Sequence, residues 1–176
     1  MGDWPQSQET NRVTISTGHP ESLGIEVANC GLNFSSTLAW PTTNGAIFVP
    51  FVLYSPMMVV KMFVSVGTAS GNVDVGIYDT GQNRLVSMGS TAMAGSSAIQ
   101  IFDIADTQLN DGVYYMAVAV DNGTGTLSAQ NPAIAITSSM GILSQSSAFP
   151  LPNPAVFAAA SAAYVPLVGL TARATV

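Results

Sequence analysis

Apolar and polar residues alternate along much of this chain, and short turns separate the alternating runs. Val73, Val75 and Ile77 are separated by single residues, so they point to one face of a strand, which is expected to face the core. Residues 79–83, DTGQN, favour a reversal because Asp, Gly and Asn accept positive φ or bond to their own backbone. The pattern therefore predicts a β-hairpin whose return strand covers residues 84–87.

Three more runs predict strands of different kinds. Residues 112–120 are apolar or aromatic on both faces, which is typical of a central strand that is covered on both sides. Residues 48–54 predict a strand bent by Pro50, and Pro56 ends this run because it lacks the amide donor that a ladder needs. Residues 59–66 alternate, and the alternation places the even-numbered residues, Val60 among them, on one face.

The C-terminal third is less regular. Residues 133–137 predict a strand, whereas residues 149–154, with three prolines, predict an extended segment without a regular partner. Residues 155–163, AVFAAASAA, have helical propensity, and residues 164–175 predict a closing strand. About eight short strands with almost no helix predict an all-β fold, a single antiparallel β-sandwich of jelly-roll-like type.

The N-terminal part differs from the rest. Residues 1–39 are mostly polar or rich in Gly and Asn, and they predict an extended N-terminal arm with the first short strands, one of them around Val13 and Ile15. Residues 40–176 form the predicted sandwich domain. Such an arm has little to pack on within its own subunit, so we expect it to reach a neighbour; a frayed terminus is the alternative.

The composition points to assembly. The chain has 176 residues, of which 48% are hydrophobic and only 8% charged, against roughly 25% charged residues in an average soluble protein. A monomer with so few charges would expose larger apolar patches than solitary proteins tolerate. We therefore expect a homo-oligomer, or burial of this surface against other proteins.

The sequence argues against nucleic acid and against a membrane as partners. The net charge is −6, and the four basic residues do not cluster, so nucleic-acid binding is not expected. Residues 46–67 are long and apolar, but Pro50, Pro56 and Lys61 interrupt them and the β-branched content is high. We therefore predict no membrane insertion.

Few residues could carry chemistry. Asp103, Asp106 and Asp111 could be imagined around a calcium ion, but they show no repeated ligand spacing, and turn or strand-end roles are favoured. His19 lies in the polar arm, and no G-x-S-x-G elbow occurs. Cys30 is alone, which excludes an intrachain disulfide and a Cys-based metal site. We predict no catalytic residue, cofactor or metal.

Aromatic residues offer the remaining candidates. A set of them could form a platform on which sugars stack, although aromatic residues in an all-β protein more often pack in a core or an interface. This set comprises Trp40, Tyr54, Tyr78, Tyr114 and Tyr115. Trp40 and Tyr78 are the candidate ligand or interface residues.

The order of features over residues 40–173 is distinctive. A Pro-containing aromatic strand (AIFVPFVLYSP) is followed by VVKMFVSVGTASGNVDVGIYDTGQNRLVSMG, by the strand DGVYYMAVAV and by a tail of small residues ending AAYVPLVGLTAR. This order resembles a domain that recurs in tailed-bacteriophage virion proteins, particularly fibre, spike and head-associated components. The resemblance implies a β-sandwich in a virion, with capsid or tail proteins as partners; it carries no site residue. Related domains typically end a long fibre chain, whereas only about forty residues precede the domain here.

Two functions are therefore expected. The first is a non-enzymatic bacteriophage virion structural protein, a capsid decoration or head-fibre component held by its N-terminal arm and subunit contacts. The alternative is a tail-fibre-type receptor module that binds host surface carbohydrate. A hydrolase acting on surface polysaccharide would need paired acids in one cleft and ranks last. Residues 1–8 lack the basic start and apolar run of a signal peptide, which predicts a virion protein made in the host cytoplasm.

Overall fold

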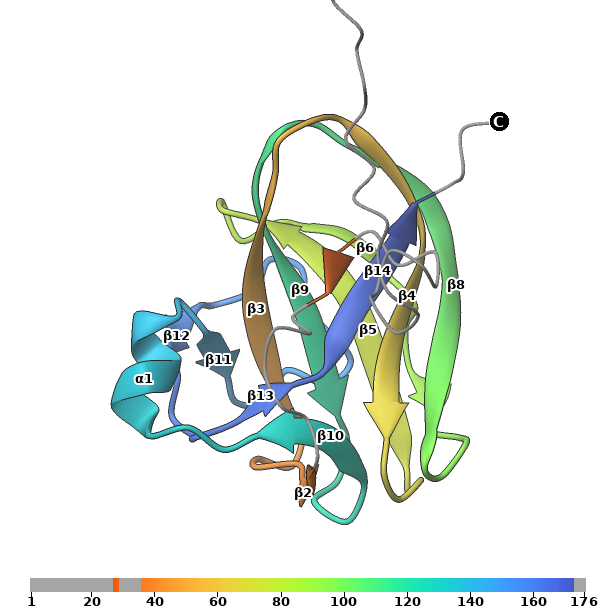
Figure 1. Ribbon diagram of the computed structural model, residues 1–176, viewed down its shortest axis with the longest axis vertical. Coiled ribbons are helices and arrows are strands. Elements are labelled where there is room, and N and C mark those ends of the chain that lie inside the picture. The colour runs from red at the N-terminus through yellow and green to blue at the C-terminus, as the bar shows by residue number, and fades with distance from the viewer. Residues whose placement is uncertain (1–26, 29–35, 173–176) are drawn as a thin grey trace, which may run out of the picture.

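In the part of the chain that the structure describes, two antiparallel β-sheets of seven strands each form the body (Figure 1). The computed structural model describes residues 27–28 and 36–172. The sheets pack face to face around an apolar core, which confirms the all-β sandwich predicted from the sequence. The predicted strand around Val13 and Ile15, together with His19 and Cys30, lies outside the described residues.

The first sheet, sheet A, has the order β1-β14-β4-β10-β13, with β2 paired to β10 and β8 paired to β4. Its strands are β1 (Val27–Ala28), β2 (Ser36–Ala39), β4 (Met57–Val66), β8 (Ala98–Leu109), β10 (Thr126–Gln130), β13 (Val165–Pro166) and β14 (Val168–Ala172).

The second sheet, sheet B, has the order β12-β11-β3-β9-β5-β6, with β7 paired to β5. Its strands are β3 (Gly45–Leu53), β5 (Asn72–Asp79), β6 (Arg84–Ser87), β7 (Thr91–Ala92), β9 (Gly112–Val120), β11 (Leu143–Gln145) and β12 (Ala158–Ala159). One helix, α1 (Ile134–Ser139), is present in the described part of the chain.

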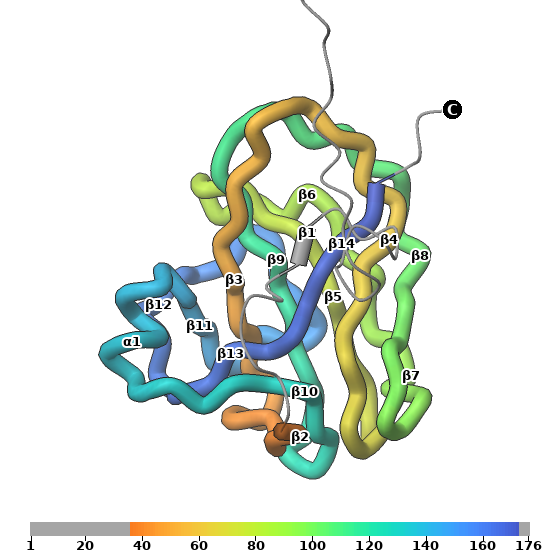
Figure 2. The backbone as a smooth tube through the Cα atoms, viewed as in Figure 1, coloured from red at the N-terminus to blue at the C-terminus, as the bar shows by residue number. Residues whose placement is uncertain are grey.

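A long two-stranded ribbon joins the two sheets. β3 pairs with β9 from Gly45 to Leu53 in sheet B, and β4 pairs with β8 from Met57 to Val66 in sheet A. The chain passes directly from β3 to β4 and from β8 to β9 at the same end of the molecule, so the ribbon arches over the core (Figure 2). This folding-over of an antiparallel ribbon gives the sandwich its jelly-roll-like character.

The predicted hairpin and central strand are confirmed. β5 and β6 pair across the turn at residues 79–83, where Asp79 Oδ1 accepts a hydrogen bond from Asn83 N at 2.8 Å. β9 covers Gly112–Val120 and lies between β3 and β5. Residues 116–120 are buried on both faces of the sheet, as a central strand requires.

The expected alternation of residues 59–66 is interrupted near its start. It places Val60 on the same face as the buried Met62 and Val59 on the other face, but Val59 is fully buried and Val60 is only half-buried. The pairing of β4 with β8 shifts between Val59 and Lys61, where residues 104–106 of β8 lie opposite Val60. An irregularity of this kind adds residues on one strand and changes which side chain faces inward.

Two predictions in the C-terminal third are also wrong. Residues 133–137 belong mainly to the helix α1 and not to a strand. The helix ends in a Schellman motif: Gly141 has a φ of 74° and donates to Ser138 O at 3.0 Å, and Ile142 donates to Thr137 O at 3.3 Å. Residues 155–163 form no helix, because a nine-residue run is marginal alone and β12 pairs instead with β11.

Candidate functional surface

Trp40 is buried in the main core. Its ring is 3% exposed, and its Nε1 donates a hydrogen bond to Gly45 O at 3.1 Å. Tyr164 lies edge-on to it, with ring centroids 5.4 Å apart. The indole therefore fastens the turn before β3 to the closing strands, and it has no free face on which a ligand could stack.

Tyr78 is also inside the protein. It is fully buried on the outer face of sheet B, with the rings of Phe48 and Phe157 at 5.2 and 6.2 Å, and its hydroxyl donates to Pro152 O. Burial raises the pKa of the Tyr78 hydroxyl well above its usual range. Of the five aromatic residues singled out from the sequence, Tyr54 is the most exposed, at 93%.

A small pocket opens beside Trp40. Its volume is about 50 Å³, whereas pockets for drug-sized ligands measure roughly 300–1,000 Å³. It is lined by Trp40, Pro41, Thr42, Gly45, Ala46, Ile47, Ile142, Leu143, Ser144, Gln145, Ser146, Ala160, Ser161, Ala162 and Tyr164. The space is too small to enclose a sugar ring.

A segment that we name the strap, residues 148–157, covers the outer face of sheet B. Its apolar residues complete a second apolar cluster there, which contains Ala46, Phe48, Tyr78, Ala117, Ala119, Ala148, Leu151 and Ala155. Polar contacts hold both ends: Ala148 N donates to Asn44 O at 2.6 Å, and Ala155 N donates to Gln82 O at 2.9 Å. The strap turns the outer face of sheet B into a second core.

Asp74 anchors the middle of the strap. It is fully buried on β5, where Oδ2 accepts from Leu151 N at 2.9 Å and Oδ1 accepts from Gly89 N at 2.9 Å. The Ser87 hydroxyl donates to Oδ1 at 2.8 Å. Burial raises the pKa of the Asp74 carboxyl, although these hydrogen bonds and the charge of Arg84 oppose the rise. Both oxygens are used to hold backbone and hydroxyl donors, which is a structural task.

The raised pKa of Asp74 predicts a pH-dependent cost for Asp74→Asn. A carboxyl whose folded pKa exceeds its unfolded value contributes most below that unfolded value, and the contribution declines as the pH rises through the folded pKa. Asp74→Asn should therefore cost more free energy of unfolding at about pH 3 than at about pH 7. Urea denaturation of both proteins at the two pH values measures the difference.

Asp121 provides a control, because the pH dependence of its contribution to stability should have the opposite sign. Burial acts to raise its pKa, but hydrogen bonds from Asn72 N and Nδ2, at 2.9 and 2.7 Å, lower it overall. Its contribution is present above the unfolded pKa and is lost as the pH falls through the folded pKa. Asp121→Asn should cost more at about pH 7 than at about pH 3, and the same pH trend in both variants would contradict this account.

The remaining acids within the described ranges do not converge. Asp103 is exposed on β8, and Asp111 is exposed in the turn before β9. The described residues contain no group of three or more His, Cys, Asp or Glu side chains placed to hold a metal ion. In the described ranges, no helix is long and apolar enough to cross a membrane.

The surface feature that the sequence patterns missed is helix α1. Large apolar side chains of this segment are exposed, namely Ile134 (50%), Ile136 (54%) and Met140 (38%). The helix projects from the side of the body next to β11 and β12 (Figure 1). A signal was present in the sequence, because residues 122–172 contain no Asp, Glu, Lys, Arg or His. We call residues 131–141 the α1 flank.

No family model, curated protein or solved structure matches this chain. Its class is therefore defined by its own fold, an all-β sandwich whose second sheet is covered by a strap and whose side carries an exposed apolar helix.

Proposed function

We propose that this chain is a non-enzymatic structural protein that acts by assembling with other subunits, as a decoration or head-fibre component of a tailed-phage virion. The proposal of assembly is supported by large apolar side chains that are exposed on a protein with only 8% charged residues. Exposed apolar surface of this kind is typical of interaction sites. The virion setting rests on the resemblance of residues 40–173 to phage virion domains.

The roles of the acids support a structural task. Asp74 directs both carboxylate oxygens at donors of its own chain, and Asp79 and Asp121 hold turns through Asn83 and Asn72. Within the described residues, these three carboxylates stabilise loops and turns by accepting hydrogen bonds. A rigid, fastened sandwich suits a subunit that must present a fixed surface to its neighbours.

The carbohydrate-binding alternative has weaker support. Stacking on a sugar needs an open aromatic face, whereas Trp40 and Tyr78 are buried and the pocket beside Trp40 is small. Tyr54 alone of the aromatic set is nearly fully exposed, and it lies in the loop between β3 and β4. A glycan array with the intact chain and with Tyr54→Ala tests this alternative, which requires binding that the substitution removes.

Immunogold electron microscopy tests the virion proposal. Antibodies against the purified chain should place gold on the capsids of intact particles of the phage that encodes it. Gold on tail tips would favour the receptor alternative. Particles that carry no gold anywhere, with an antibody that recognises the purified chain, would contradict the proposal.

A further inference from the structure

We propose that the α1 flank is the surface through which two copies of this chain associate, helix against helix. This inference rests on the proposed function, because it names the partner and the surface of the assembly. The partner of the α1 flank is a second copy of this chain.

The helix α1 exposes apolar side chains and buries a polar one, which reverses the usual distribution. A helix at the surface of a soluble protein normally buries its apolar side chains and exposes its polar ones. In α1 the buried residue is Thr137, whereas Ile134 and Ile136 are half exposed, and Met140 after the helix is 38% exposed. Ile136 and Met140, four positions apart, lie on one side of the helix, whereas Ile134, two positions before Ile136, points away from that side. The exposed apolar side is therefore formed by Ile136 and Met140.

The helix also lacks the usual local sources of stability. It has six residues, no side-chain cap at Ala133, no acid in its first turn and no base in its last turn. Isolated helices this short are unstable in water, so packing must stabilise them. Contacts between Ile136 and Met140, one turn apart, and their counterparts in a second copy would supply packing that the described residues of one chain do not.

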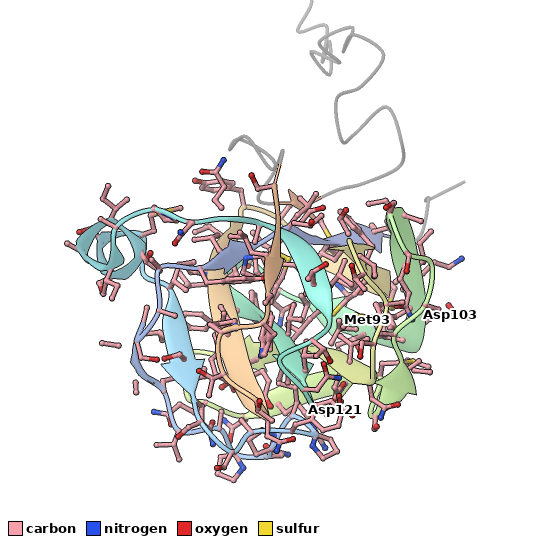
Figure 3. The ribbon with its side chains drawn as sticks, turned by 90° about the horizontal axis from the view of Figure 1, so that it is seen from below. Met93, Asp103 and Asp121 are labelled. Carbon is pink, nitrogen blue, oxygen red and sulfur yellow. The ribbon has the colours of Figure 1, made fainter. Side chains whose placement is uncertain are left out.

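The charge distribution favours a second copy as the partner. Every copy carries a net charge of −6, so two copies repel wherever their acids approach one another. The α1 flank lies within residues 122–172, which contain no charged residue, and Asp103 lies at the opposite side of the molecule from α1 (Figure 3). An isologous contact places the same patch against itself, and an uncharged patch brings no like charges together when it does so.

Two other exposed apolar pairs are less suited to such a contact. Ile99 and Ile101 lie on β8, but the exposed Asp103 follows on the same face of that strand. Val52 and Val113 are direct partners across β3 and β9, and the exposed Asp111 lies two residues before Val113. Self-pairing through the Val52–Val113 patch would bring Asp111 of the two copies together, and self-pairing through β8 would require burial of Asp103 and of its exposed cross-strand partner Lys61.

Sedimentation velocity of three full-length proteins tests the inference. Wild type is compared with Ile136→Asp and with the matched control Ile101→Asp, which places the same charge at an exposed isoleucine on the other side of the molecule. Wild type and Ile101→Asp should sediment at twice the 18.1 kDa mass of one chain. Ile136→Asp should raise the dissociation constant of the dimer about 100-fold or more, because it buries two like charges.

The outcomes separate this inference from the proposed function. A dimer that survives Ile136→Asp, or that Ile101→Asp dissociates equally, overturns the inference and leaves the function standing. A monomeric wild type that still labels virions also overturns it, since the flank would then serve a different virion protein. A monomeric wild type that labels no particle overturns both. Thermal melting of each variant checks that the exposed substitutions leave the fold intact.

Discussion

Asp74→Ala is expected to lower the free energy of unfolding by about 3 to 4 kcal/mol, because it removes the carboxylate that three donors share. These donors are Leu151 N, Gly89 N and the Ser87 hydroxyl, all within 3.0 Å of the carboxylate of the fully buried Asp74. Gly89 N keeps a second acceptor in Ser87 Oγ at 3.0 Å, whereas Leu151 N loses the carboxylate that holds it. A buried donor without a partner costs about 1–3 kcal/mol, and the strap loses its central anchor at the same time. A loss of this size is a large part of the roughly 5–15 kcal/mol that stabilises a typical domain.

Urea denaturation at neutral pH measures this loss. Asp103→Ala is the matched control, because Asp103 is an exposed aspartate on a strand and its removal should change the free energy by no more than about 0.5 kcal/mol. If Asp74→Ala cost as little as the control, Asp74 could not be the anchor of the strap.

Phe48→Ala is expected to cost about 4 kcal/mol of unfolding free energy, because it empties the centre of the second cluster. Phe48 is fully buried between the rings of Tyr78 and Phe157, with centroids 5.2 and 4.7 Å away. The neighbouring rings belong to a strand and to the strap, so the cavity cannot close without moving one of them.

The matched control lies on the same strand. Val52 follows Phe48 on the same face of β3 but is 48% exposed beyond the strap, so Val52→Ala should cost about 0.5 kcal/mol. Thermal or urea unfolding of both variants gives the comparison. Equal and small costs would mean that the strap does not form a second core.

Local patterns predicted the strands whose neighbours are close in sequence. The β5–β6 hairpin depends on a turn of five residues, and β9 is apolar on both faces, so each could be recognised from its own stretch. The shift from Val60 to Val59 could not, because it arises from the residues of β8 that lie opposite. Alternation describes one strand, whereas a bulge is a property of a pair.

The candidate site was harder to predict for the same reason. Asp74 alternates with the core valines of β5 and so has the position of a solvent-facing residue, but the strap covers it from more than seventy positions away in the sequence. Trp40 and Tyr78 are buried by equally distant segments, around Tyr164 and Phe157. The sequence shows that these residues are polar or aromatic; only the fold shows what covers them.

Helix α1 was missed because its residues give conflicting local signals. Ile134, Ile136 and Thr137 are β-branched and favour strands, whereas the helix is ended by Gly141, a signal that lies outside the predicted strand. The wider signal is the absence of charge over residues 122–172, which no motif or periodicity captures. Depletion of charged residues is a feature of the cores of protein–protein interfaces.

Light scattering of the intact wild-type chain over a dilution series tests the central claim, that copies of this protein associate through its uncharged apolar surface. We expect a mass of twice 18.1 kDa that falls toward 18.1 kDa only on dilution. A mass of 18.1 kDa at every concentration would contradict it.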